Sequence, residues 1–170
     1  MLIRIRYRPR GAGARFVHPI DPEPRTAILV PGFQETKMVR VFAQGWDDRA
    51  ARFQPTSVAG TMDQLRQVAE AGVELSHAVI AFTYPDEPGL SRSDRDLLWQ
   101  GLGVPIFEQY LDRNNKLLAM ECDAHAGMHV VAGCEGLDVE SEVCACGNRA
   151  PRLMRGVRGV RIEELAALLA

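Results

Sequence analysis

Apolar runs and amphipathic segments alternate along most of the chain. Short apolar runs bounded by glycine, proline or polar residues predict β-strands at residues 2–7, 26–30, 77–83, 105–110 and 116–122. Apolar positions three or four residues apart predict helices at residues 35–53, 61–71 and 91–101. The second and third of these helices begin at capping sequences, Thr61 with Gln64 and Ser91 with Asp94.

Four further segments complete this pattern. Residues 153–161 predict a strand with basic residues facing outward, and residues 162–170 predict a short C-terminal helix. The apolar run at residues 57–60 is too short to assign. Residues 11–24 are rich in proline and charge, which predicts a surface loop that exposes His18.

The order of these elements predicts the fold class. Strands and helices alternate between residues 26 and 110, which is typical of an α/β layer with a mainly parallel sheet and flanking helices. The two strands at 105–110 and 116–122 are separated by a turn sequence, which favours an antiparallel hairpin. We therefore predict an α/β layer at residues 1–116, an antiparallel segment at 117–152, and a C-terminal strand and helix at 153–170, all within one compact domain.

Composition is that of an ordinary globular protein. The 170 residues are 46% hydrophobic and 25% charged, enough for a single domain with a substantial core. A net charge of −2 gives no electrostatic case for binding nucleic acid. Neither a signal peptide nor an apolar run of membrane-spanning length is visible, so the sequence predicts a cytoplasmic, reduced protein with no membrane contact.

Cysteine and histidine are clustered near the end of the chain. All four cysteines and two of the four histidines lie between Cys122 and Cys146. Thiolate and imidazole are the ligands that tetrahedral zinc sites prefer, and such sites are built from two short ligand pairs separated by a loop. Buried thiols that cluster by chance are the alternative, and a disulfide framework would need an oxidising compartment. We therefore predict that zinc is bound by residues 117–152, so that the tail is an antiparallel zinc-bound segment.

Six candidates compete for four ligand positions. Gly147 follows the last cysteine pair and lets the chain turn, so that backbone N–H groups can approach the sulfurs. Cys122 follows an apolar strand, and the first histidine comes three residues later, within one turn. The predicted ligands are Cys122, His125, Cys144 and Cys146.

Two alternates remain open. His129 follows Gly127, which leaves the direction of its side chain undetermined, and Cys134 lies on a glycine-flanked turn from which it could replace either histidine. A structural site is favoured over a catalytic one, because a catalytic zinc needs an open position and a nearby acid or base in a cleft. No residue is therefore assigned a catalytic role.

Residues 54–130 resemble the middle segment of adenylate-forming enzymes of the phenylacetate–CoA ligase kind. The matching pieces are a Pro-Thr segment, an A-E-A-G helix end, a V-P-I-F-E-Q-Y strand and a C-x-x-x-x-G-M-H segment, here Pro55-Thr56, Ala69–Gly72, Val104–Tyr110 and Cys122–His129. The last piece is the most specific, because cysteine, glycine and histidine recur at matching offsets. The resemblance implies a shared scaffold and a metal-stabilised loop.

The ATP-binding motifs of that family have no counterpart here. The family follows the matching tyrosine with a glycine, which lets the backbone approach the adenylate, and a glutamate that holds magnesium; Tyr110 is followed by Leu111, Asp112, Arg113 and Asn114. A Ser/Thr/Gly-rich phosphate loop is also missing from the sequence. The resemblance therefore does not imply ligase activity.

These observations predict a non-catalytic, zinc-stabilised α/β domain, related in scaffold to acyl-CoA ligases, that binds a partner protein or a small ligand, or forms a homo-oligomer. One alternative is a zinc- or cysteine-dependent enzyme acting on a small acyl or nucleotide substrate. A weaker alternative is a zinc-ribbon nucleic-acid binder, because five arginines recur at every third position: Arg149, Arg152, Arg155, Arg158 and Arg161. Gly156 and Gly159 argue against the helix that this stripe would need.

Overall fold

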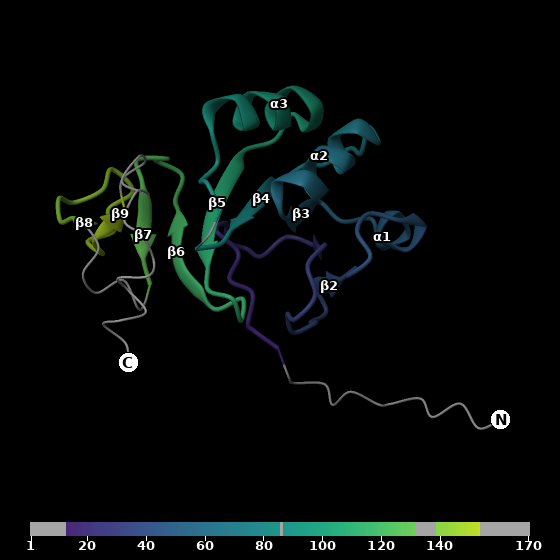
Figure 1. Cartoon of the computed structure of the whole chain (residues 1–170), viewed down its shortest axis with the longest axis horizontal. Helices are drawn as coiled ribbons and strands as arrows, with labels where there is room; N and C mark the ends of the chain where they lie inside the picture. Colours follow the sequence, from purple (N-terminus) through teal and green to yellow (C-terminus); the bar gives the residue numbers. More distant parts are fainter. Residues whose placement is uncertain (1–12, 86, 132–138, 154–170) are drawn as a thin grey trace.

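The computed structural model of the chain describes residues 13–85, 87–131 and 139–153. Within these residues, nine strands form one sheet in the order β2-β1-β3-β4-β5-β6-β7-β9-β8 (Figure 1). The predicted strand at 2–7, the helix at 162–170 and most of the strand at 153–161 lie outside the described residues.

The elements follow one another as strands and three intervening helices. The strands are β1 (Thr26–Ile28), β2 (Val39–Val41), β3 (Ser57–Gly60), β4 (Ala78–Thr83), β5 (Ile106–Leu111), β6 (Leu117–Glu121), β7 (Met128–Val130), β8 (Val139–Glu140) and β9 (Arg152–Leu153). The helices are α1 (Asp48–Phe53), α2 (Met62–Glu70) and α3 (Arg92–Leu102).

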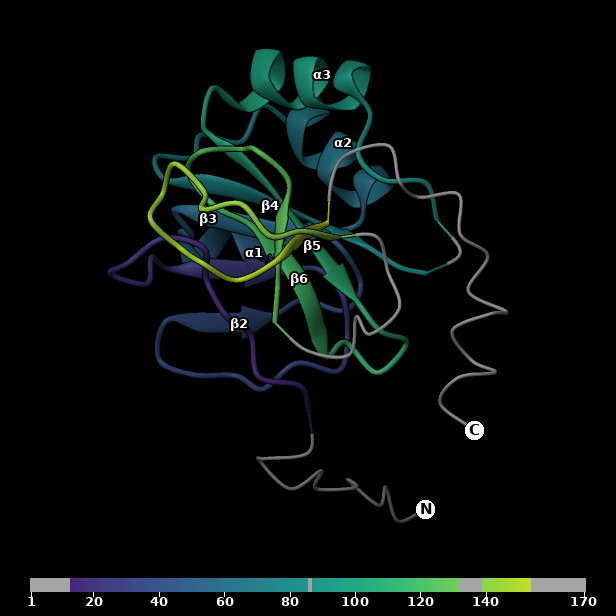
Figure 2. The ribbon, with the colours of Figure 1, turned by 90° about the vertical axis from the view of Figure 1, so that its left-hand side faces the viewer.

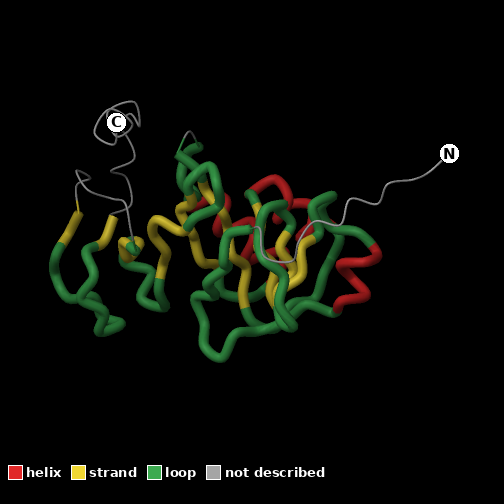
Figure 3. The backbone as a smooth tube through the Cα atoms, turned by 90° about the horizontal axis from the view of Figure 1, so that it is seen from below, coloured by secondary structure: helices red, strands yellow, loops and turns green. Residues whose placement is uncertain are grey.

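The first half of the sheet is parallel, as predicted. β1, β3, β4 and β5 are adjacent and parallel, and β2 pairs in parallel with the other edge of β1. The crossovers from β2 to β5 all advance in one direction along the sheet. Because such crossovers are almost always right-handed, their helices lie on the same face. Figure 3 shows the helices gathered over this half of the sheet.

Each face of the parallel half has its own core. On the helix side, Leu65 and Val68 of α2 and Leu98 of α3 pack with strand residues such as Val58 and Val79. On the opposite face, strand residues pack with the segments before β1 and after it, which bring in Phe16 and Phe33. Phe33 stacks on Phe82 with ring centroids 5.2 Å apart. Phenylalanine side chains from irregular segments therefore cover the face opposite the helices.

The predicted helices α2 and α3 are confirmed together with their caps. The Gln64 side chain accepts the Thr61 N–H at 3.0 Å, and Asp94 accepts the Ser91 N–H at 3.0 Å. The unassigned run at 57–60 is a strand, β3, buried between two neighbours.

The predicted helix at 35–53 is wrong for most of its length. Residues 39–41 form the edge strand β2, and only 48–53 are helical. Side chains within the segment support the strand, since the N–H of Val39 donates to Thr36 at 3.0 Å and that of Val41 to Glu35 at 3.0 Å. Gly45, at φ +90°, lies in the turn that separates β2 from α1, and Asp47 then caps the N-terminus of α1. The apolar residues of this segment do have helical spacing, but Gly45 interrupts it, and pairing with the open edge of β1 stabilises the strand instead.

The second half of the sheet is antiparallel. β6 pairs with β5, which confirms the predicted hairpin, and β7 pairs with β6. β9 pairs with β7, and β8 lies outside β9 at the edge of the sheet. Figure 2 shows this end in front of the parallel strands. The sheet is therefore continuous across residue 116, and the cysteine-rich segment is its antiparallel extension.

Candidate metal centre

Two hairpins each supply two of the clustered ligands. β6 ends at Glu121, so that Cys122 is the first residue of the loop that leads into β7. In the β6–β7 pairing, His129 lies opposite Met120. Because side chains alternate along a strand, Cys122 and His129 share the face of this hairpin that carries Met120.

The second pair comes from the long loop between β8 and β9. Cys144 and Cys146 lie in a tight turn, in which the Gly147 N–H donates to the Cys144 carbonyl at 2.8 Å. Gly147 adopts φ +84°, a backbone conformation that favours glycine. This is the turn that the Cys-x-Cys-Gly sequence predicted.

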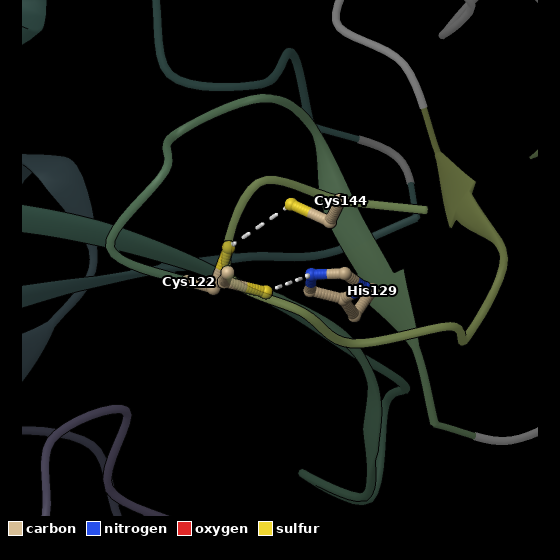
Figure 4. A group of neighbouring side chains, drawn as sticks. Cys122, His129 and Cys144 are labelled. Carbon is tan, nitrogen blue, oxygen red and sulfur yellow. Dashed lines mark hydrogen bonds between the residues drawn. The ribbon is translucent and has the colours of Figure 1, made fainter. Parts of the chain in front are cut away.

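The four side chains converge on one point. The ligand atoms of Cys122, His129, Cys144 and Cys146 all lie within 4.8 Å of one another. The sulfurs of Cys122 and Cys144 are 3.7 Å apart, a contact that a dashed line marks in Figure 4. The sulfur of Cys146 is 3.3 Å from Nε2 of His129. Figure 4 also shows Cys122, His129 and Cys144 turned toward one another.

These separations suit a tetrahedral ion. With metal–sulfur bonds of about 2.3 Å and metal–nitrogen bonds of about 2.0 Å, the edges of a tetrahedral site measure about 3.5–3.8 Å. The two shortest separations, 3.7 Å and 3.3 Å, are close to those edges. The longest, 4.8 Å, would shorten by about 1 Å when the ligands close on an ion.

Backbone N–H groups point at all three sulfurs. The N–H of Ala124 donates to the sulfur of Cys122, that of Cys146 to Cys144, and that of Asn148 to Cys146. Each donor lies two residues beyond its cysteine. Hydrogen bonds of this kind stabilise thiolates, which are the form that binds metal.

The orientation of His129 fits the same role. Its Nδ1 lies 3.3 Å from the Ala150 carbonyl, to which a protonated Nδ1 donates. This contact fixes the tautomer that leaves Nε2 free as an acceptor facing the sulfurs. The residue is 3% exposed, and its two nitrogens face the Ala150 carbonyl and the sulfur of Cys146.

The cluster shifts the thiol pKa values in opposite directions. The Cys146 N–H, aided by neighbouring side chains, lowers the pKa of Cys144 to about 6. Burial raises the pKa of Cys122 to about 11. A cation at the centre would favour the thiolate at both positions. Of these two thiols, Cys144 is therefore the one that ionises more readily.

His125, one of the four predicted ligands, lies outside this group, and the alternate His129 takes its place. His125 adopts φ +48°, and its ring packs on Phe107 with centroids 5.1 Å apart, while Nδ1 lies 3.7 Å from a carboxylate oxygen of Glu121. The apolar run that follows Gly127 is compatible with the strand β7, but the place of His129 among the ligands follows from its pairing opposite Met120. Cys134, the other alternate, lies outside the described residues.

One arginine of the basic row is used inside the fold. The guanidinium of Arg152 donates to the Ala126 carbonyl at 2.7 Å and to Glu140 at 2.8 Å, and the residue is 6% exposed. It therefore joins the loop after Cys122 to β8. Arg155, Arg158 and Arg161 lie outside the described residues.

No model of a known protein family matches the chain, and no curated protein matches it significantly. The resemblance to phenylacetate–CoA ligase-like enzymes therefore stays a prediction. Among the residues that the structure describes, no helix is both long enough and apolar enough to cross a membrane.

Proposed function

We propose that this chain is a zinc-stabilised α/β domain in which Cys122, His129, Cys144 and Cys146 hold the ion. The observation that carries the proposal is the convergence of three sulfurs and one imidazole nitrogen within 4.8 Å. Three thiolates and one imidazole form a donor set typical of structural zinc. Zinc is favoured over harder cations such as magnesium or calcium, because those prefer oxygen ligands.

A structural role suits this donor set better than a catalytic one. Four protein ligands fill a tetrahedral shell and leave no open position for water or substrate. The ion would join the β6–β7 hairpin to the β8–β9 loop, two short elements that carry little apolar core of their own. We propose that the resulting surface is non-catalytic and binds a partner protein or a small ligand. The scaffold resemblance to acyl-CoA ligases supports this proposal only at the level of fold.

Cys146 is exposed, so the alternative of a cysteine-dependent enzyme can be tested at this residue. A cysteine nucleophile must be a reactive thiolate that a substrate can reach. In the proposed zinc site, all three thiols resist alkylation until a chelator removes the ion. Rapid alkylation of Cys146 in protein that retains its zinc would support a catalytic thiol instead.

The first experiment measures the metal content of untagged protein purified under reducing conditions. We expect about one zinc per chain. His129→Ala is expected to abolish stoichiometric zinc, and His125→Ala, which removes the nearby histidine of the same loop, is expected to retain it. Wild-type protein with under about a tenth of an equivalent of any metal would contradict the proposal, as would loss of zinc in His125→Ala alone.

A further inference from the structure

A buried ion-pair network lies directly beside the first metal ligand. Glu121 and Glu108 are 1% and 2% exposed, and Arg95 of α3 reaches both carboxylates. Its guanidinium binds the two oxygens of Glu121 in a bidentate pair, at 3.0 Å and 2.9 Å, and contacts Glu108 at 3.2 Å. Buried charge of this kind is expensive unless it is paired, so the network fixes the positions of its members.

Glu121 lies where β6 separates from β5. The last paired residues of these two strands are Gln109 and Met120. One residue further on, the Glu108 N–H donates at 2.8 Å to the carboxylate of Glu121. The side chain of Glu121 thus occupies the point of separation, and the next residue is the ligand Cys122.

We propose that Arg95 and Glu121 are positioning residues of the metal centre. They hold the end of β6 against α3 and so set where the sulfur of Cys122 lies relative to the other three ligands. This inference rests on the zinc site proposed above and adds that the affinity of the site depends on a helix that contributes no ligand.

The chain offers a matched pair of variants for the test. Glu121→Gln and Glu108→Gln make the same chemical change at two buried carboxylates that share Arg95, but only Glu121 adjoins a ligand. Glu108→Gln also keeps the backbone N–H that Glu121 accepts. Both variants are expected to lower the stability of the fold. Only Glu121→Gln is expected also to displace the sulfur of Cys122 from its place among the ligands.

The measurement is the dissociation constant of Zn²⁺, from competition with a chromophoric chelator, together with the visible absorption of the Co²⁺-substituted site. We expect Glu121→Gln to weaken zinc binding by about 10- to 100-fold and Glu108→Gln by about threefold at most. The Co²⁺ bands are expected to change in Glu121→Gln only, because they report the ligand geometry rather than the stability of the fold.

Arg95→Lys is a second variant that tests the same proposal if Glu121→Gln does not fold. Lysine keeps the positive charge but cannot make two parallel bonds to one carboxylate, so zinc affinity is expected to fall while the fold persists. Equal effects of the two glutamate variants, or unchanged affinity in both Glu121→Gln and Arg95→Lys, would overturn the proposal. Wild-type protein that binds neither Zn²⁺ nor Co²⁺ would instead refute the metal site itself.

Discussion

His18 is half-buried against the face of the sheet opposite the helices, although the sequence predicted an exposed loop histidine. Its Nδ1 lies 3.0 Å from the Ile20 N–H, and its ring meets Phe16 edge-on at 5.8 Å. Nε2 is buried with no hydrogen-bond partner among the described residues. Burial lowers the pKa of His18 from 6.5 to about 4, so the fold holds this imidazole neutral.

This shift predicts a pH dependence of stability. The unfolded chain takes up a proton at this histidine near pH 6.5, and the folded chain resists protonation down to about pH 4. The contribution of neutral His18 is therefore complete above pH 6.5 and declines as the pH falls toward 4. His18→Asn retains an acceptor for the Ile20 N–H but does not titrate, so its free energy of unfolding is expected to fall less than that of wild type.

Urea denaturation of both proteins, measured without metal across the interval from pH 6.5 to 4, provides the check. If the free energy of unfolding falls equally with pH in wild type and His18→Asn, the histidine does not contribute to the pH dependence.

At the scale of elements, α2 and α3 approach each other closely at Gly101. A Cβ at this position would lie 2.7 Å from Cβ of Ala69. Real Cβ atoms essentially never come this close, and the obstructing atom belongs to a short, rigid side chain. The absence of a side chain at Gly101 therefore sets how closely α3 packs on α2.

We expect Gly101→Ala to destabilise the protein, contrary to what helix propensity alone predicts. Alanine gains up to about 1 kcal/mol over glycine within a helix. Overpacking costs about 1–3 kcal/mol, so the net loss in the free energy of unfolding is about 1 kcal/mol. Gln100→Ala, at an exposed position of the same helix, is expected to change stability by about 0.5 kcal/mol at most.

Denaturant unfolding measures these differences, and Ala69→Gly should recover part of the loss in the Gly101→Ala background. Stabilisation by Gly101→Ala alone would mean that the two helices separate at little cost.

At the scale of the whole molecule, the two halves of the sheet are stabilised by different means. The parallel half has a core on each face. The β7–β9–β8 end has short pairings, the buried Arg152 and the four converging ligands. We infer that the proposed metal supplies much of the cohesion at this end, because strands of two or three residues bury little apolar surface.

Removal of metal should therefore loosen one end of the molecule before the other. After chelation, backbone amides at 122–131 and 139–153 are expected to exchange faster with solvent, while those of β3, β4 and β5 remain protected. Hydrogen exchange followed by mass spectrometry, with and without chelator, makes the comparison. If chelation speeds amide exchange equally along the chain, or does not speed it at 122–131 and 139–153, the metal does not stabilise this end of the sheet in particular.

Local signals in the sequence predicted much of this architecture. The capping sequences at Thr61 and Ser91 specified α2 and α3, because side-chain caps act within a few residues. The continuous apolar run at β4 indicated a strand buried on both faces. The turn before Lys116 indicated the β5–β6 hairpin. Each of these signals depends only on neighbours along the chain.

The tertiary structure decided what depends on distant partners. Residues 39–41 became a strand because β1 offered an open edge, and His18 became half-buried because Phe16 packs on the sheet. The sequence showed that cysteine and histidine cluster, and it specified the Cys144–Cys146 turn. It could not choose between His125 and His129, since that choice follows from the register of β7 on β6, and hydrogen bonds between strands fix a register that no local pattern encodes.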